Sequence, residues 1–242
     1  MAKKYKICID AGHGGNSDPG AVNGNYYEKE AALMIACKLG KALALAGVEV
    51  IYTRKNDSTV ELEERTAFAN KNAADYFISI HLNAATNKQA NGIETFAYSD
   101  GGVAYKLASA VQNELIAKTG ATDRKAKTAN FYVLRKTAMP AILIETGFIS
   151  NDLEAKALFA DGYQTIIANA IAKAVLNFLG IKGDTLMVKR YNYLLEIPAG
   201  EFRETIKELM EKKIINQPDG KLDLGYDMIR TFVINRRAGL YK

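Results

Sequence analysis

Two hydrophobic patterns alternate along the chain as far as about residue 180, short apolar runs and longer amphipathic stretches. The short runs are rich in β-branched and aromatic residues, which predicts strands at 5–10, 48–53, 76–82, 92–98, 131–135 and 141–146. Helical periodicity lies between them, at 29–46, 58–71, 102–119 and 162–179. A capping-box pattern, Ser58–Glu61, opens the second of these helices. Alternating strands and helices predict an α/β fold with a largely parallel, twisted sheet covered by helices on both faces.

The pattern changes after residue 183, where predicted strands end and two helical stripes follow. The first stripe contains Phe202, Ile206, Leu209 and Ile214, and the second contains Ile229, Phe232 and Val233. A Pro-Asp-Gly turn at 218–220 separates them. We therefore expect an α/β domain at 1–182 and a small all-helical module at 184–242. The alternative is that 184–242 is a helical cap packed on the first domain.

Composition excludes several classes of protein. With 242 residues, of which 48% are hydrophobic and 24% charged, the chain matches a globular protein and not a disordered one. The net charge of +5 comes without a clustered basic stripe, so no nucleic-acid partner is expected. Cys8 and Cys37 lie in apolar runs and form no disulfide framework. Polar residues interrupt the most apolar stretch, 166–181, which argues against membrane insertion.

The N-terminus shows no secretory signal, because the apolar run at 5–10 is too short for one. The expectation is therefore a protein that is synthesised in the cytoplasm. If it acts outside the cell, another factor must release it.

Two histidines are the clearest chemical signal in the chain. His13 and His81 each stand at the carboxyl end of a predicted strand, the edge at which parallel sheets bind ligands. Two imidazoles suggest a metal, and an open catalytic zinc site needs a third protein ligand. The residue pattern leaves four candidate acids for that ligand: Asp10, Asp18, Glu28 and Glu30.

Glu145 ends the apolar run 141–144, where a carboxylate is costly unless it is paired or functional. Desolvation there would raise its pKa toward the range useful for a general base. The alternative is an ion pair with Arg65 or Arg135. The glycine-rich segment 12–15 lacks the ending of a phosphate-binding loop, and no G-x-S-x-G nucleophile motif is present.

Four motifs together resemble the zinc-dependent N-acetylmuramoyl-L-alanine amidases, the Amidase_3 family, over about residues 5–180. They are Asp10-Ala11-Gly12-His13-Gly14-Gly15, Glu28, Ser79-Ile80-His81-Leu82-Asn83-Ala84 and Ile144-Glu145-Thr146-Gly147-Phe148-Ile149-Ser150-Asn151. The resemblance implies that His13, Glu28 and His81 hold Zn²⁺ and that Glu145 is catalytic. It also implies a structural role for Arg65 and a substrate contact at Asn130.

The activity implied is hydrolysis of the amide between N-acetylmuramic acid and L-alanine, so that the partner is peptidoglycan of the bacterial cell wall. The rivals are a zinc peptidase of the same fold that cuts another wall amide, and a non-catalytic wall-binding protein. A metal phosphoesterase is disfavoured because the site offers a single carboxylate ligand. The segment 184–242 loosely resembles helical modules at the ends of phage-type wall hydrolases, which suggests wall attachment or a homodimer. An endolysin released by a holin and an autolysin both fit this pattern.

Overall fold

The structure is a computed structural model that describes residues 4–181, 190–191, 200–211 and 224–225. The chain divides into two compact units, 1–186 and 187–242. No helix within the described ranges combines the length and the apolar character needed to cross a membrane.

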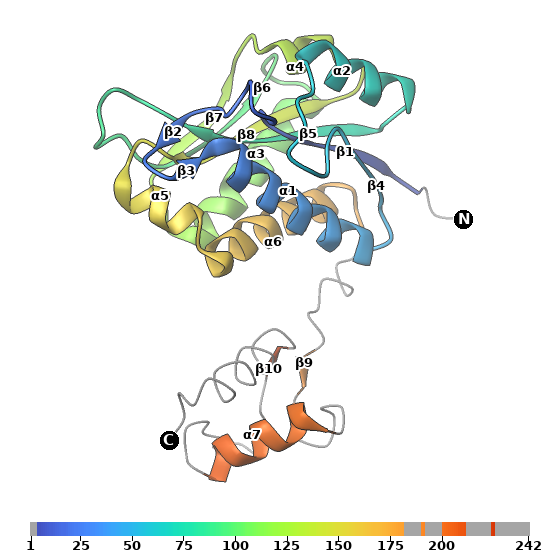
Figure 1. Cartoon of the computed structure of the whole chain (residues 1–242). Coiled ribbons are helices and arrows are strands. Elements are labelled where there is room, and N and C mark those ends of the chain that lie inside the picture. Colours follow the sequence, from blue (N-terminus) through green and yellow to red (C-terminus); the bar gives the residue numbers. More distant parts are fainter. Residues whose placement is uncertain (1–3, 182–189, 192–199, 212–223, 226–242) are drawn as a thin grey trace. The chain divides into compact units, whose positions relative to one another are not determined.

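A six-stranded sheet forms the centre of the first unit (Figure 1). In spatial order its strands are β4 (Glu49–Tyr52), β1 (Lys6–Ala11), β5 (Tyr76–Asn83), β8 (Ala141–Phe148), β6 (Ile93–Ala97) and β7 (Asp123–Thr128). The first four run parallel, β6 is antiparallel to β8, and β7 is parallel to β6. This confirms a largely parallel sheet. It also means that β6 and β7 end at the edge opposite to the carboxyl ends of the other four strands.

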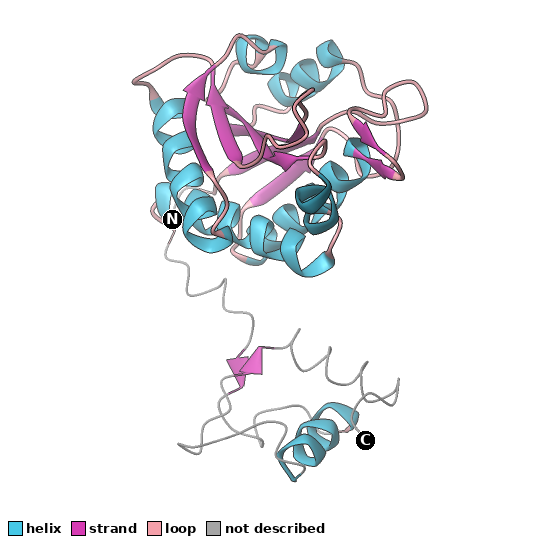
Figure 2. Ribbon diagram, turned by 90° about the vertical axis from the view of Figure 1, so that its left-hand side faces the viewer, coloured by secondary structure: helices cyan, strands magenta, loops and turns pink. Residues whose placement is uncertain are grey.

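Helices cover both faces of the sheet, as predicted (Figures 1 and 2). One face packs against α1 (Glu28–Leu45), α3 (Val103–Thr119) and α6 (Asp161–Phe178) through a large apolar cluster. The other face packs against α2 (Leu62–Lys71) and α4 (Tyr132–Lys136) through a smaller one. A short hairpin, β2 (Val22–Asn23) and β3 (Tyr26–Tyr27), leads into α1, and α5 (Asp152–Leu158) follows β8. Burial on both faces explains why the central strands are almost wholly apolar.

The strand predicted at 131–135 is wrong, because this segment forms the helix α4. Its neighbouring residues Val133 and Leu134 are both buried in the cluster that contains Phe77. Consecutive strand residues would point to opposite faces, whereas one helical turn places both on the same side. Hydrophobic periodicity does not predict β7, whose residues are mostly polar and which pairs with β6 at the edge of the sheet.

The start of the second predicted helix also needs correction. The capping box is formed by Glu61 and Glu64, and α2 begins at Leu62. The Thr59 hydroxyl instead lies 3.1 Å from the Ser17 hydroxyl, in the loop that follows β1. Residues of the predicted box thus support that loop. The helix α5 was not predicted at all.

The second unit contains the helix α7 (Glu201–Glu211), within which Ile206 and Leu209 of the first predicted stripe are buried. It also contains a short antiparallel pair of strands, β9 (Arg190–Tyr191) and β10 (Leu224–Gly225), which hydrophobic periodicity did not predict. The second predicted stripe, at 229–233, lies outside the described residues.

Candidate active site

Two buried arginines hold the loop that follows β1 and carries His13. Arg65 of α2 donates from Nη1 to the Asp10 carboxylate at 2.8 Å and to the Ala11 carbonyl at 2.6 Å. Its Nη2 donates to the His13 carbonyl at 2.8 Å. Arg54, after β4, donates from Nε to the Ala11 carbonyl at 2.9 Å. These bonds satisfy carbonyls that leave the sheet, and they support His13 in a left-handed conformation with φ of 58°.

The buried carboxylate of Asp10 anchors Arg65 in this position. Burial by itself raises the pKa of Asp10, but the charge of Arg65 and hydrogen bonds from Ser79, Thr53 and Arg65 outweigh it and lower the pKa. Arg65 is thereby engaged with Asp10 and with backbone carbonyls. The alternative in which Arg65 pairs with Glu145 is not observed.

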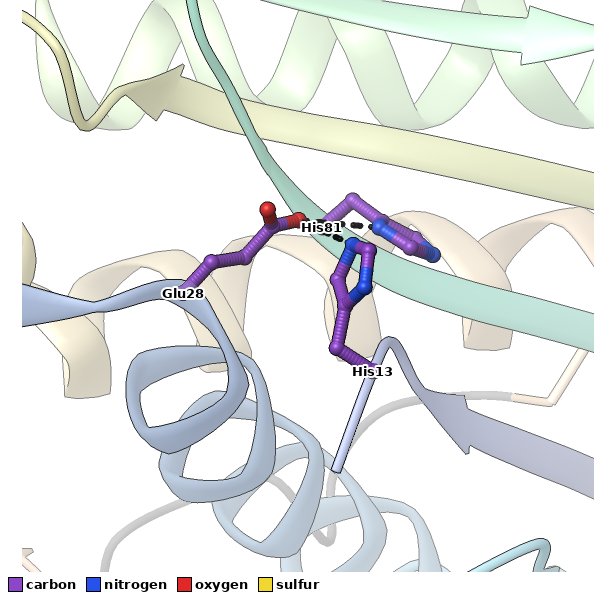
Figure 3. A group of neighbouring side chains, drawn as sticks. All are labelled: His13, Glu28 and His81. Atoms are coloured by element: carbon purple, nitrogen blue, oxygen red, sulfur yellow. Dashed lines mark hydrogen bonds and ion pairs between the residues drawn. The ribbon is translucent and has the colours of Figure 1, made fainter. Parts of the chain in front are cut away.

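Glu28, the first residue of α1, brings the two histidines together (Figure 3). Its buried carboxylate places Oε1 2.9 Å from Nδ1 of His81, on β5, and 3.3 Å from Nε2 of His13. The Leu82 amide donates to Oε1 at 3.0 Å and the Ala21 amide to Oε2 at 2.9 Å. One ligand atom from each of the three side chains lies within 4.8 Å of the others, which makes this group a candidate metal centre.

The other three candidate acids have different surroundings. Asp18 Oδ1 lies 2.6 Å from Nδ1 of His13, so that the opposite ring nitrogen faces Glu28. A carboxylate in this position orients a metal-binding imidazole. Asp10 is bonded to Arg65, and Glu30 is exposed on α1. Glu28 is therefore the acid that meets both histidines.

The protonation behaviour of the cluster shows that it attracts positive charge. Burial lowers the pKa of His13, but hydrogen bonds and charge from Glu28 and then Asp18 outweigh burial and raise it to about 9. The pKa of His81 is also raised, since Glu28 and Glu145 outweigh burial. Burial by itself raises the pKa of Glu28, but hydrogen bonds and charge from the two imidazoles outweigh burial and lower it. A bound cation would supply the positive charge that these carboxylates favour. Two imidazole nitrogens with one carboxylate oxygen form a donor set that suits zinc.

Glu145 stands directly beside this cluster. It pairs in register with His81 on the neighbouring strand, so that both side chains leave the same face of the sheet. Its Oε2 is buried and has no hydrogen-bond partner in the described part of the chain. Burial raises the pKa of Glu145 to about 7, with support from Glu28 and Glu94 and against the opposing charge of His81. The carboxyl group can therefore change its protonation state near neutral pH.

The sheet topology places Asn130 away from the cluster, so that the substrate contact implied for it would lie outside the candidate metal centre and stays a prediction. Asn130 lies two residues beyond Thr128, the last residue of β7. Thr128 pairs in register with Ala97 of β6, and Ala97 pairs with Ile142, near the start of β8. At about 3.3 Å per residue and 4.8 Å per strand, Asn130 lies roughly 20 Å from Glu145. Its side chain is exposed and accepts a hydrogen bond from Arg135. No ion pair between Arg135 and Glu145, the other alternative for Glu145, is observed among the described residues.

Sequence reasoning missed several residues that shape the site. Arg54 acts through backbone carbonyls, which leave no motif. The sequence pattern presents Asp18 only as a candidate metal ligand, whereas in the structure it bonds to the His13 ring. Gly12 carried a usable signal, since glycine is required where two chain segments approach closely. A Cβ at this position would lie 2.3 to 2.6 Å from three atoms of the His81 ring.

A largely parallel sheet with three convergent donors at its carboxyl edge, beside a carboxyl group with one buried oxygen, is the arrangement of a metal-dependent hydrolase. Comparison with known proteins gives the particular family. The family model described as N-acetylmuramoyl-L-alanine amidase matches residues 7–177. The chain belongs to this family, whose members are generally metal-dependent, and it is a peptidoglycan amidase.

Individual relatives support this assignment. The sporulation-specific N-acetylmuramoyl-L-alanine amidase of Bacillus subtilis is 38% identical over 180 residues, which cover 73% of this chain and 69% of that protein. The endolysin of Bacillus phage SPP1 is 36% identical over 183 residues, or 73% of this chain and 66% of that protein. The crystal structure of an N-acetylmuramoyl-L-alanine amidase from Clostridium difficile 630 superimposes with a TM-score of 0.71 at 38% identity, covering 75% of this chain and all of that one.

Proposed function

We propose that the protein cleaves the amide between N-acetylmuramic acid and L-alanine with zinc held by His13, Glu28 and His81, and with Glu145 as the general base. The observation that supports this most strongly is the meeting of the three donors beside a buried, unpartnered carboxylate oxygen of Glu145. When bound, zinc supplies a Lewis acid that polarises the scissile carbonyl and lowers the pKa of a water toward about 7.

The chain's own groups keep the three donors in place. Backbone amides of Leu82 and Ala21 hold the two oxygens of Glu28, and Asp18 fixes the orientation of the His13 ring. Arg54 and Arg65 support the loop backbone beneath His13. Each donor is thus oriented before any ligand arrives, which lowers the cost of assembling the site.

Glu145 performs the proton transfers in this proposal. Its carboxylate takes a proton from the attacking water and delivers it to the amide nitrogen of L-alanine, because that nitrogen cannot leave as an anion. A pKa near 7 suits both steps, since the group accepts and releases a proton at similar cost near neutral pH.

The biological role we infer is cell-wall lysis, as an endolysin or an autolysin. The relatives include one protein named as a phage endolysin and one named as a sporulation-specific N-acetylmuramoyl-L-alanine amidase. We also propose that residues 184–242 form a separate module for wall attachment or homodimer formation, since the match to the amidase family ends at residue 177.

Digestion of purified cell walls tests the proposed reaction. We expect new N-terminal alanine without new reducing ends, loss of this activity with a chelator, and recovery with added zinc. Glu145→Gln should keep its metal content but lose about 10² to 10⁴ in rate, the usual contribution of a general base. His81→Ala should lose both metal and activity.

Glu30→Gln, on the same helix as Glu28 but exposed, is the matched control and should behave like the parent protein. Release of a different N-terminal residue would favour the peptidase, and chelator-resistant lysis would contradict the metal site. Loss of zinc from Glu145→Gln would show that Glu145 is a ligand.

A further inference from the structure

A row of charged side chains continues from the candidate metal centre across the sheet. Glu145 of β8 pairs in register with His81 of β5 on one side and with Glu94 of β6 on the other. Residues paired in register on neighbouring strands leave the same face of a sheet. The carboxylate of Glu94 therefore stands one strand beyond Glu145, on the face that carries the centre.

Two cations from β7 meet the Glu94 carboxylate. Lys127 Nζ donates to Glu94 Oε2, and Arg124 Nε donates to the same oxygen at 3.4 Å. Asn83, at the end of β5, donates to the other oxygen. The Glu94 side chain is only 7% exposed, so its charge needs partners, and these three donors compensate it. One carboxylate with two cations leaves one positive charge in excess.

The excess charge faces solvent. The side chains of Arg124 and Lys127 are 35% and 41% exposed. The Arg124 guanidinium lies 4.8 Å from the centroid of the Phe148 ring, a contact that holds its plane. Within the described residues Arg124 uses only Nε toward Glu94, which leaves its two terminal nitrogens available to a carboxylate.

The spacing matches a dipeptide. From Glu145 to the cations of β7 there are two strand intervals, or about 10 Å. Two extended residues span about 7 Å, and a side-chain or terminal carboxylate adds a few more ångströms. A peptide whose first nitrogen is the scissile one beside Glu145 would thus bring a carboxylate of its second residue to Arg124 and Lys127.

We propose that Arg124 and Lys127 form a subsite for the carboxylate of an acidic second residue in the peptide released by the reaction. The subsite depends on the proposed amidase function for the identity of its ligand, an acidic peptide that begins with alanine. Glu94 keeps the two cations in place, and the row Glu145, Glu94, Arg124 and Lys127 extends the active site along the peptide.

Peptide binding to the full-length protein tests this subsite without any need for turnover. The probes are L-alanyl-D-glutamate and its diamide, and titration calorimetry measures the affinity of each. We expect the parent to bind the acid at least about 10-fold more tightly than the diamide, the range of a charge-assisted hydrogen bond. Arg124→Gln and Lys127→Gln should each reduce this preference severalfold without weakening diamide binding, and circular dichroism should show that both variants are folded.

Lys125→Gln is the matched control, because Lys125 is 75% exposed and pairs with Asp123, not with Glu94. It should keep the preference of the parent. Equal affinity of the parent for the two peptides, or an equal loss for both peptides in the Lys127→Gln variant, would overturn the subsite. A parent that prefers the acid but releases no alanine peptide from walls would instead retain the subsite and contradict the proposed function.

Discussion

At Gly12 the main chain passes directly against the ring of His81. The nearest ring atom would lie 2.3 Å from a Cβ at this position, closer than any real contact allows. The ring cannot move freely, because its Nδ1 is bonded to Glu28. Gly12 thus belongs to the candidate metal centre through the space it leaves open.

Gly12→Ala is therefore expected to displace His81 and to lower zinc affinity by at least about 10-fold, the effect of disturbing ligand orientation. Metal analysis after dialysis against a weak chelator measures the loss. Gly162→Ala, in α6, is the control, since nothing lies within 4 Å of its added Cβ and alanine favours a helix. Full zinc retention in Gly12→Ala would show that the loop relaxes around the methyl group.

Between elements, the ion pair of Arg65 and Asp10 joins α2 to the end of β1. Both side chains are almost fully buried, 3% and 1% exposed. Removal of one partner from such a pair leaves the other charge buried and uncompensated. The pair therefore fastens α2 beneath the loop that presents His13.

We expect Asp10→Asn to lower the free energy of unfolding by about 3 to 5 kcal/mol at pH 7. The folded pKa of Asp10 is lowered, so its contribution is complete above the unfolded pKa of about 3.9 and disappears as the pH falls through the folded value. Urea unfolding of the metal-free protein should show the difference from the parent shrinking below about pH 4.

Asp161→Asn is the surface control for this measurement, since the side chain of Asp161 is 88% exposed in its ion pair with Lys38. A surface pair contributes at most about 1 kcal/mol. A loss in Asp10→Asn no larger than in this control would contradict the role of the buried pair.

At the scale of the whole molecule, the candidate centre lies entirely in the first unit. His13, Glu28, His81 and Glu145 all precede residue 186, where that unit ends. The match to the amidase family, residues 7–177, also lies within this unit. We therefore expect residues 1–182 to fold alone, bind zinc and cleave soluble muropeptides at a rate close to that of the full chain.

The same truncation should reduce lysis of intact walls more than cleavage of small fragments, if 184–242 attaches the enzyme to its substrate. Pull-down of the isolated tail on walls and light scattering of both proteins separate wall attachment from homodimer formation. A truncated protein that fails to fold, together with a tail that neither binds walls nor changes the mass, would show that the segment is a structural cap.

The sequence alone was sufficient for the central sheet strands and for the motifs that carry His13, Glu28, His81 and Glu145. Apolar runs buried on both faces are local signals, and they place the ends of β1, β5 and β8 at one edge. Side chains that follow these strand ends, such as His13, His81 and Glu145, therefore lie at the same edge of the sheet. The residue pattern left four acids open and the family resemblance implied Glu28, and the structure shows that Glu28 is the acid that meets both rings.

Tertiary structure alone decided the features that depend on distant partners. The polar strand β7 exists because its backbone pairs with β6, and the segment 131–135 is helical because Val133 and Leu134 share one apolar cluster. The reversed direction of β6 and β7 places Asn130 away from the cluster. It also sets Glu94 beside Glu145, with Arg124 and Lys127 of β7 bonded to Glu94. Backbone pairing and strand direction are set by contacts between segments far apart in the chain, which no local pattern of residues encodes.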